Sequence, residues 1–89
     1  MIGVYIRPTQ MSEEQYRRVD DRLRASGVEP KGMKMHSCFG EGDGIAIFDV
    51  WETEADFNAF AAHLAPIVAA EGLEPVTPMI VPMIAFDVA

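Results

Sequence analysis

Apolar positions at the start of the chain alternate first with the period of a strand and then with the period of a helix. Residues 2–7 place apolar side chains at every second position, which is typical of a strand. Residues 12–26 follow a helical repeat. Ser12 and Gln15 have the spacing of a capping box, and Gly27 stands where a left-handed residue ends a helix. The pattern therefore predicts a strand and then a helix over 12–26.

Two further strands are expected to form a hairpin. Residues 32–39 and 44–51 both alternate, and the glycine-rich turn between them contains an Asp-Gly pair, which is a hairpin signal. Such a turn joins antiparallel neighbours. We therefore expect His36 to lie near Asp49 if the register of the hairpin permits it.

A second helix follows the hairpin. Thr53 is placed as its N-cap, and apolar residues then recur at helical spacing to about Ala70. Pro66 lacks the amide donor that a helix interior needs, so we expect a kink or a break near residues 62–65.

The end of the chain, residues 76–88, is expected to be a fourth strand. Pro78 and Pro82 cannot donate to a strand ladder, which predicts an edge strand, a bulge or an interruption there. The order β-α-β-β-α-β is that of a ferredoxin-like fold. Residues 1–89 are thus predicted to be one α+β domain, with a four-stranded antiparallel sheet covered by helices on one face.

Alternation divides the strand positions into two faces. One set is wholly apolar, and we expect the helices to cover it: Ile2, Val4, Ile6, Met33, Met35, Ala46, Phe48 and Val50. The other set is mixed and is expected on the open face: Tyr5, Arg7, Lys34, His36, Cys38, Ile45, Ile47, Asp49 and Trp51. An exposed patch of this kind predicts either a homodimer that packs sheet face to sheet face or a cleft that holds a ligand.

Composition supports association and narrows the possible partners. Hydrophobic residues make up 49% of the chain, more than a small monomer easily buries. The net charge is −7, and all seven Lys and Arg lie within residues 1–34. An acidic chain is repelled by phosphate backbones and anionic lipids, so neither nucleic acid nor membrane is expected as a partner.

Cysteine content and hydropathy predict a cytoplasmic location. The chain has one cysteine, Cys38, so no intrachain disulfide can form. Residues 1–6 resemble a strand rather than a leader peptide, and no apolar run approaches the roughly 18 residues of a membrane span. Protein thiols of this kind persist in a reducing compartment.

His36 is the leading candidate for catalysis. A neutral imidazole on the expected open face can remove a phenolic or carbon-bound proton from a ligand. Asp49 needs a partner on an inward face, and Arg7, Lys34 and His36 are the candidates; such a pair would be either structural or a catalytic support. The alternative is a structural pair within the dimer interface.

Four other side chains are candidates for binding a substrate. Tyr5 and Trp51 can stack on a flat ring or simply pack in the interface, and Trp51 can instead hold its strand against the helix that follows. Arg7 can hold a carboxylate through two hydrogen bonds. Cys38 lies two strand positions from His36, which separates their Cα atoms by roughly 6–7 Å and disfavours a Cys–His nucleophile. No local spacing of ligands predicts a metal site.

The junction between the third strand and the second helix carries a family motif. It reads Asp49-Val50-Trp51-Glu52-Thr53 and continues through Phe57, Phe60, Leu64-Ala65-Pro66 and Gly72. This segment resembles the dimeric α+β barrel superfamily, especially its antibiotic biosynthesis monooxygenase-like branch, in which a "DVWES" sequence occupies this junction. His36 also stands where a His often occurs in that branch.

The sequence departs from the family pattern in two places. Related chains often carry a second His near the end of the last strand, where residues 83–86 read Met-Ile-Ala-Phe. The haem-degrading branch uses an Asn on the first strand, and residues 2–7 contain none. The resemblance therefore favours a role other than haem degradation.

The resemblance implies a cofactor-independent monooxygenase that acts on a small aromatic or polyketide-like substrate. His36 would generate a substrate anion that reacts with oxygen, with the ligand between the sheet and the helices or in the dimer cavity. Non-oxidative cyclisation or isomerisation would use the same base. A non-catalytic dimeric protein, with a binding or purely structural role, is the competing class.

Overall fold

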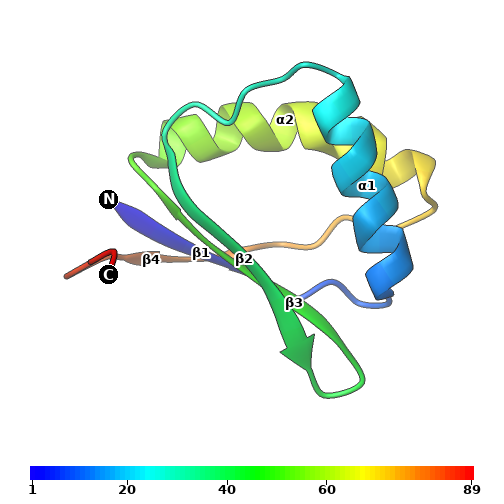
Figure 1. Cartoon of the computed structure of the whole chain (residues 1–89), viewed down its shortest axis with the longest axis horizontal. Coiled ribbons are helices and arrows are strands. Elements are labelled where there is room, and N and C mark those ends of the chain that lie inside the picture. The colour runs from blue at the N-terminus through cyan, green and yellow to red at the C-terminus, as the bar shows by residue number, and fades with distance from the viewer.

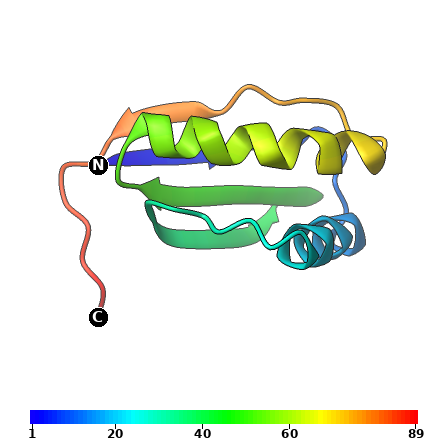
Figure 2. The same ribbon diagram turned by 90° about the horizontal axis from the view of Figure 1, so that it is seen from above.

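A four-stranded antiparallel sheet carries both helices on one face in the computed structural model, which describes residues 1–89 (Figure 1). In chain order the elements are β1 (Ile2–Ile6), α1 (Glu13–Ala25), β2 (Met33–Glu41), β3 (Gly44–Trp51), α2 (Glu54–Ala70) and β4 (Met79–Pro82). The strands are ordered β2-β3-β1-β4, as the view from above shows (Figure 2). The predicted ferredoxin-like α+β fold is confirmed.

Local signals in the sequence define α1. The Ser12 hydroxyl accepts a hydrogen bond from the backbone amide of Gln15, and the Gln15 side chain accepts one from the amide of Ser12. This capping box satisfies two amides that a helix start leaves unpaired. Farther along α1, Arg18 and Arg22 form ion pairs with Glu71 just after α2, which ties the two helices together.

A kink or a break was expected near residues 62–65, and the break is absent, because α2 continues through Pro66 as a single helix. Proline removes one backbone hydrogen bond. The helix is held to the sheet on both sides of its middle, since Phe60 is part of the core and Leu64 packs against it. Neither helix is both long enough and apolar enough to cross a membrane.

The fourth strand is an edge strand, as its prolines predicted. It is shorter than the expected 76–88, because pairing with β1 is confined to Met79–Pro82. Pro78 and Pro82 stand at the two ends of this short ladder, where a missing amide donor costs least.

The register of the central strands places the two faces differently from the prediction. Val4 is paired with Asp49, and Ile2 is paired with Trp51. Paired residues lie on the same face of a sheet, so Asp49 and Trp51 face the helices together with Val4. His36 is paired with Asp49 and shares that face.

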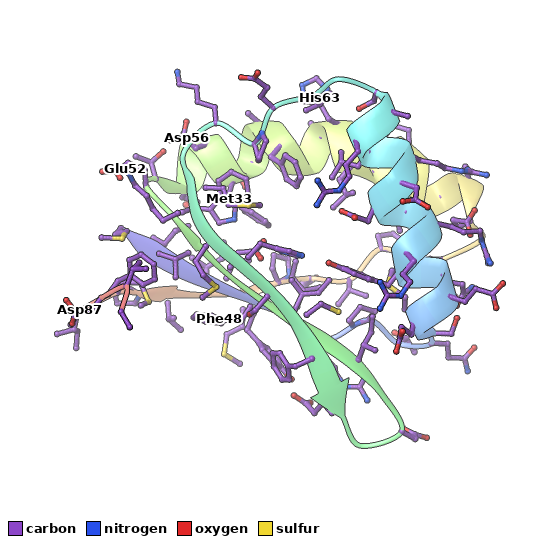
Figure 3. The ribbon with its side chains drawn as sticks, in the orientation of Figure 1. Met33, Phe48, Glu52, Asp56, His63 and Asp87 are labelled. Atoms are coloured by element: carbon purple, nitrogen blue, oxygen red, sulfur yellow. The ribbon has the colours of Figure 1, made fainter.

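The opposite face therefore belongs to a different set of side chains. Tyr5 is paired with both Phe48 and Met79, so all three point away from the helices. A β-bulge between Met33 and Met35 also separates two residues that were expected on one face. Met33 packs against the core beneath α2, whereas Phe48 lies on the far side of the sheet (Figure 3).

The core lies between the sheet and α2. It consists of Val4, Trp51, Phe57 and Phe60, with Trp51 fully buried. The Trp51 ring meets Phe57 edge-on at 5.8 Å between centroids and Phe60 in a tilted contact at 5.2 Å. Trp51 was expected on the open face, and its size explains the correction, because it fills the space between β3 and α2.

Candidate active site

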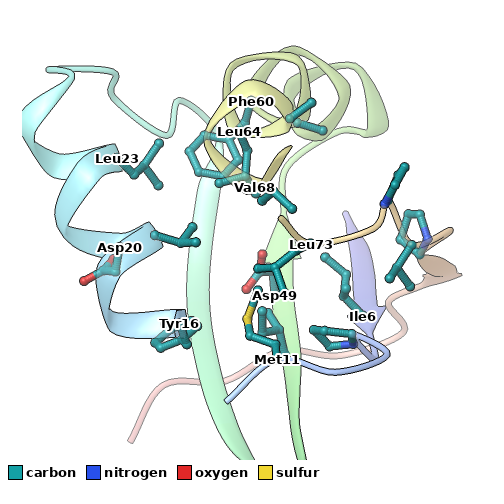
Figure 4. A pocket seen from close by; sticks show the side chains of 18 of the residues that line it. Ile6, Met11, Tyr16, Asp20, Leu23, Asp49, Phe60, Leu64, Val68 and Leu73 are labelled. Atoms are coloured by element: carbon teal, nitrogen blue, oxygen red, sulfur yellow. The ribbon is translucent and has the colours of Figure 1, made fainter. Parts of the chain in front are cut away.

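A large cavity lies between the helix-covered face of the sheet and the two helices. Its volume is about 1160 Å³, and 17 of its 33 lining residues are hydrophobic. Leu23 of α1, Phe60 and Leu64 of α2, and Ile6 of β1 project into it (Figure 4). The cavity is large enough for a ligand of several fused rings, since small-molecule pockets commonly measure about 300–1,000 Å³.

His36 and Asp49 line this cavity and contact each other across the β2–β3 ladder. The distance from His36 Nδ1 to Asp49 Oδ1 is 2.6 Å. The other carboxylate oxygen, Asp49 Oδ2, accepts a hydrogen bond from Trp51 Nε1 at 3.4 Å. Asp49 thus has the two partners that a buried carboxylate needs, and the contact expected from the hairpin is present.

Burial differs sharply between the two members of this pair. The Asp49 side chain is only 6% exposed, whereas the His36 side chain is 36% exposed. The hydrogen bond to Asp49, together with its negative charge, raises the pKa of His36 above the ordinary value of 6.5, although burial opposes the shift. The pair therefore favours a proton on the imidazole, which suits a proton acceptor.

Tyr16 completes a chain of three polar side chains. Its hydroxyl lies 2.5 Å from His36 Nε2, and the two rings are nearly parallel. Asp49 accepts from Nδ1–H of the neutral imidazole, so Nε2 is the acceptor for the Tyr16 hydroxyl. The sequence pattern assigned Tyr16 to the apolar stripe of α1. Tyr16 is the only residue of that stripe with a hydroxyl, and this hydroxyl was the one feature of the sequence that could have indicated a polar role.

Charged groups around the cavity are mostly acidic. The charged lining residues are Asp20, Arg24, Glu29, Asp49 and Glu74. The single guanidinium, that of Arg24, is held by Asp20 in an ion pair of 2.9 Å. No free positive charge on the lining balances the remaining carboxylates. The cavity therefore disfavours an anionic ligand.

Tyr5 and Arg7 lie on the face of the sheet opposite the cavity. The Tyr5 hydroxyl donates to the Glu41 carboxylate at 2.6 and 2.7 Å. Arg7 donates to the carbonyl of Ile45 at 2.8 Å and also pairs with Glu41. The expectation that these side chains share a face with His36 is wrong, because β1 is displaced by one position relative to the assumed register.

The last two predicted residues are on the cavity face of the sheet but do not line the cavity. Trp51 is fully buried and touches the site only through its bond to Asp49. Cys38 is half-buried, and burial raises the pKa of its thiol, which disfavours the reactive thiolate. A role for either in binding substrate stays a prediction. No group of three or more His, Cys, Asp or Glu is placed to hold a metal ion.

Comparison with solved structures supports the fold across the whole chain. The cofactor-independent oxygenase SnoaB from Streptomyces nogalater has a similar structure with a TM-score of 0.64 at 16% identity, covering 96% of this chain and 93% of that protein. A protein of unknown function from Nitrosomonas europaea has a TM-score of 0.66 at 16% identity, covering 99% and 91%. Rv0793 from Mycobacterium tuberculosis has a TM-score of 0.60 at 14% identity, covering 96% and 94%.

These matches confirm the predicted resemblance to the antibiotic biosynthesis monooxygenase-like proteins at the level of fold. No protein-family model matches the chain, and no curated protein is similar to it in sequence. One fold serves many chemistries. The function must therefore be argued from the side chains that line the cavity.

Proposed function

We propose that the protein is a cofactor-independent monooxygenase that removes a proton from a flat, uncharged aromatic or polyketide-like molecule. His36 accepts the proton, and Asp49 orients the imidazole and stabilises its charged form. The resulting anion reacts with dioxygen, so that an activated ring methylene and one O₂ become a ring ketone and one water. The fold shared with an oxygenase is consistent with this chemistry.

The His36–Asp49 pair facing a mainly apolar cavity is the observation that carries the proposal. A buried carboxylate on Nδ1 fixes the tautomer and stabilises the imidazolium, which is the arrangement of a general base. The apolar walls suit a ring system, and the excess of carboxylates selects against an acidic substrate. Neutral phenols and ring ketones fit both conditions.

The proposal is tested with anthrone, a flat ketone whose ring methylene is acidic. Under argon in D₂O, the protein is expected to accelerate deuterium exchange at that methylene by about 10²-fold or more over buffer, as measured by NMR. Admission of oxygen is then expected to give anthraquinone and water with matching oxygen uptake. Exchange without oxygen uptake would indicate an isomerase or cyclase. Binding without exchange would contradict a catalytic role.

The rate of this exchange is expected to rise with pH. Asp49 raises the pKa of His36, and only the neutral imidazole accepts a proton. The rate should therefore be low below pH 6.5 and reach half its maximum above pH 6.5. A midpoint below that value would mean that His36 is not the titrating base.

The same proposal includes a homodimer formed through the face of the sheet opposite the cavity. Its apolar side chains remain uncovered, with Phe39 41%, Met79 60% and Val81 36% exposed. Phe48 packs closely over Gly3, which has no side chain to obstruct it, so apolar surface extends across β1 and β3 beside the polar Tyr5, Arg7 and Glu41. A second copy related by a two-fold axis would cover it.

Light scattering at low micromolar concentration is expected to give twice the 9.8 kDa mass of one chain. Replacing Met79 with lysine places a charge in the proposed interface, so Met79→Lys should shift the mass toward that of the monomer. The matched change Ala62→Lys, at an exposed position of α2, should leave the dimer intact. A wild-type monomer would contradict this part of the proposal.

A further inference from the structure

The Tyr16 hydroxyl is hydrogen-bonded to Nε2 of His36, which is the ring nitrogen that Asp49 leaves available as a base. Asp49 Oδ1 lies 2.6 Å from Nδ1 of His36, and the Tyr16 hydroxyl lies 2.5 Å from Nε2. Each ring nitrogen therefore already has a partner. A proton from a ligand in the cavity reaches His36 either through Tyr16 or by displacing it.

We propose that Tyr16 is a catalytic residue that relays the proton from substrate to His36. The bond from the substrate to its proton breaks as a new bond forms to the Tyr16 oxygen. The original hydroxyl proton of Tyr16 passes at the same time to His36 Nε2. The phenol is neutral before and after the transfer, and the imidazolium is left beside Asp49. This inference rests on the proposed function, because it assumes that His36 is the final acceptor.

The position of Tyr16 suits a relay. The capping box at Ser12 fixes the start of α1, and Tyr16 follows in its first turn, where it reaches across to β2. Both Tyr16 and His36 line the cavity, and Tyr16 stands on the same side of it as Asp20 and Leu23 (Figure 4). A ligand between α1 and the sheet therefore comes within reach of both Tyr16 and His36.

The surroundings keep the phenol protonated. Burial raises the pKa of Tyr16 to about 12, and the neighbouring Cys38, Asp20 and Asp49 add to the effect, while Arg24 opposes it. These groups face the hydroxyl from α1, β2 and β3. A phenol with this pKa has a proton to give at neutral pH, so it acts as a relay rather than as a phenolate base.

The inference is tested by Tyr16→Phe, which keeps the ring and removes only the hydroxyl. In the anthrone exchange assay, the rate is expected to fall by about 10²-fold, close to the loss in His36→Ala. Anthrone affinity by calorimetry and the melting temperature should stay near wild type, because the phenylalanine ring keeps the stacking on His36 and the lining of the cavity. Ser37→Ala, which also removes a hydroxyl hydrogen bond from β2, should leave the rate unchanged.

The two variants separate this inference from the proposed function. A rate in Tyr16→Phe that equals or exceeds wild type, with His36→Ala inactive, would overturn the relay and leave Tyr16 as a tie between α1 and β2. Full activity in His36→Ala would instead overturn the proposed function. A fall in Tyr16→Phe that is matched by a fall in anthrone affinity would assign Tyr16 to binding and would also overturn the relay.

Discussion

Replacing His36 with alanine is expected to lower the rate of anthrone deuterium exchange by about 10²–10⁴-fold. The substitution removes the only base that faces the cavity with a buried carboxylate behind it. It should not unfold the protein, because the His36 side chain is partly exposed and lies at the margin of the core. The measurement is the initial exchange rate by NMR under argon, at a pH above the midpoint of the wild-type profile.

The second histidine of the chain provides a matched control, because it lies away from the cavity. His63 lies exposed on α2 and does not line the main cavity. His63→Ala should therefore exchange anthrone at the wild-type rate. Asp49→Asn should retain binding but lower the rate, because it removes the charge that stabilises the imidazolium. An exchange rate in His36→Ala within twofold of wild type would remove His36 from the mechanism.

Replacing Trp51 with alanine is expected to lower the free energy of unfolding by about 3–5 kcal/mol. Trp51 is fully buried, contacts Phe57 and Phe60, and donates its indole hydrogen to Asp49. The loss is a large share of the roughly 5–15 kcal/mol that stabilises a typical domain. The melting temperature should fall by at least about 10 °C, measured by circular dichroism because Trp51 is the sole tryptophan.

Two companion variants divide this effect into its parts. Trp51→Phe keeps an aromatic ring in the core but removes the indole donor, so it should cost much less than Trp51→Ala while weakening the hold on Asp49. Val88→Ala truncates an apolar side chain that is 81% exposed and should change the free energy of unfolding by less than about 0.5 kcal/mol. A melting temperature for Trp51→Ala within about 3 °C of wild type would contradict the central place of Trp51 in the core.

Sequence signals that act over short distances predicted the elements well. Ser12 and Gln15 specify the start of α1 through hydrogen bonds within a single turn. The two-residue turn Gly42-Asp43 brought β2 and β3 together, and with them His36 and Asp49. In each case the interacting residues are close in the chain, so the pattern contains the information that the structure uses.

The faces of the sheet could not be predicted in the same way. Strand side chains alternate, so an error of one position in the pairing of β1 with β3 exchanges the two faces. Both faces of β3 carry apolar residues here, and hydrophobic pattern therefore did not choose between them. Tyr5 and Arg7 were placed with His36 for this reason, although Val4 is the residue paired with Asp49.

The sequence by itself determined the order of elements, the ferredoxin-like architecture and the contact between His36 and Asp49, because these depend on local hydrogen bonds and on one short turn. Only the tertiary structure decided that Trp51 is the centre of the core, that α2 passes through Pro66 without a break, and that Tyr16 reaches Nε2 of His36. These features depend on contacts between side chains of different elements. Such contacts follow from how large side chains fill the space between the sheet and the helices, which no local pattern records.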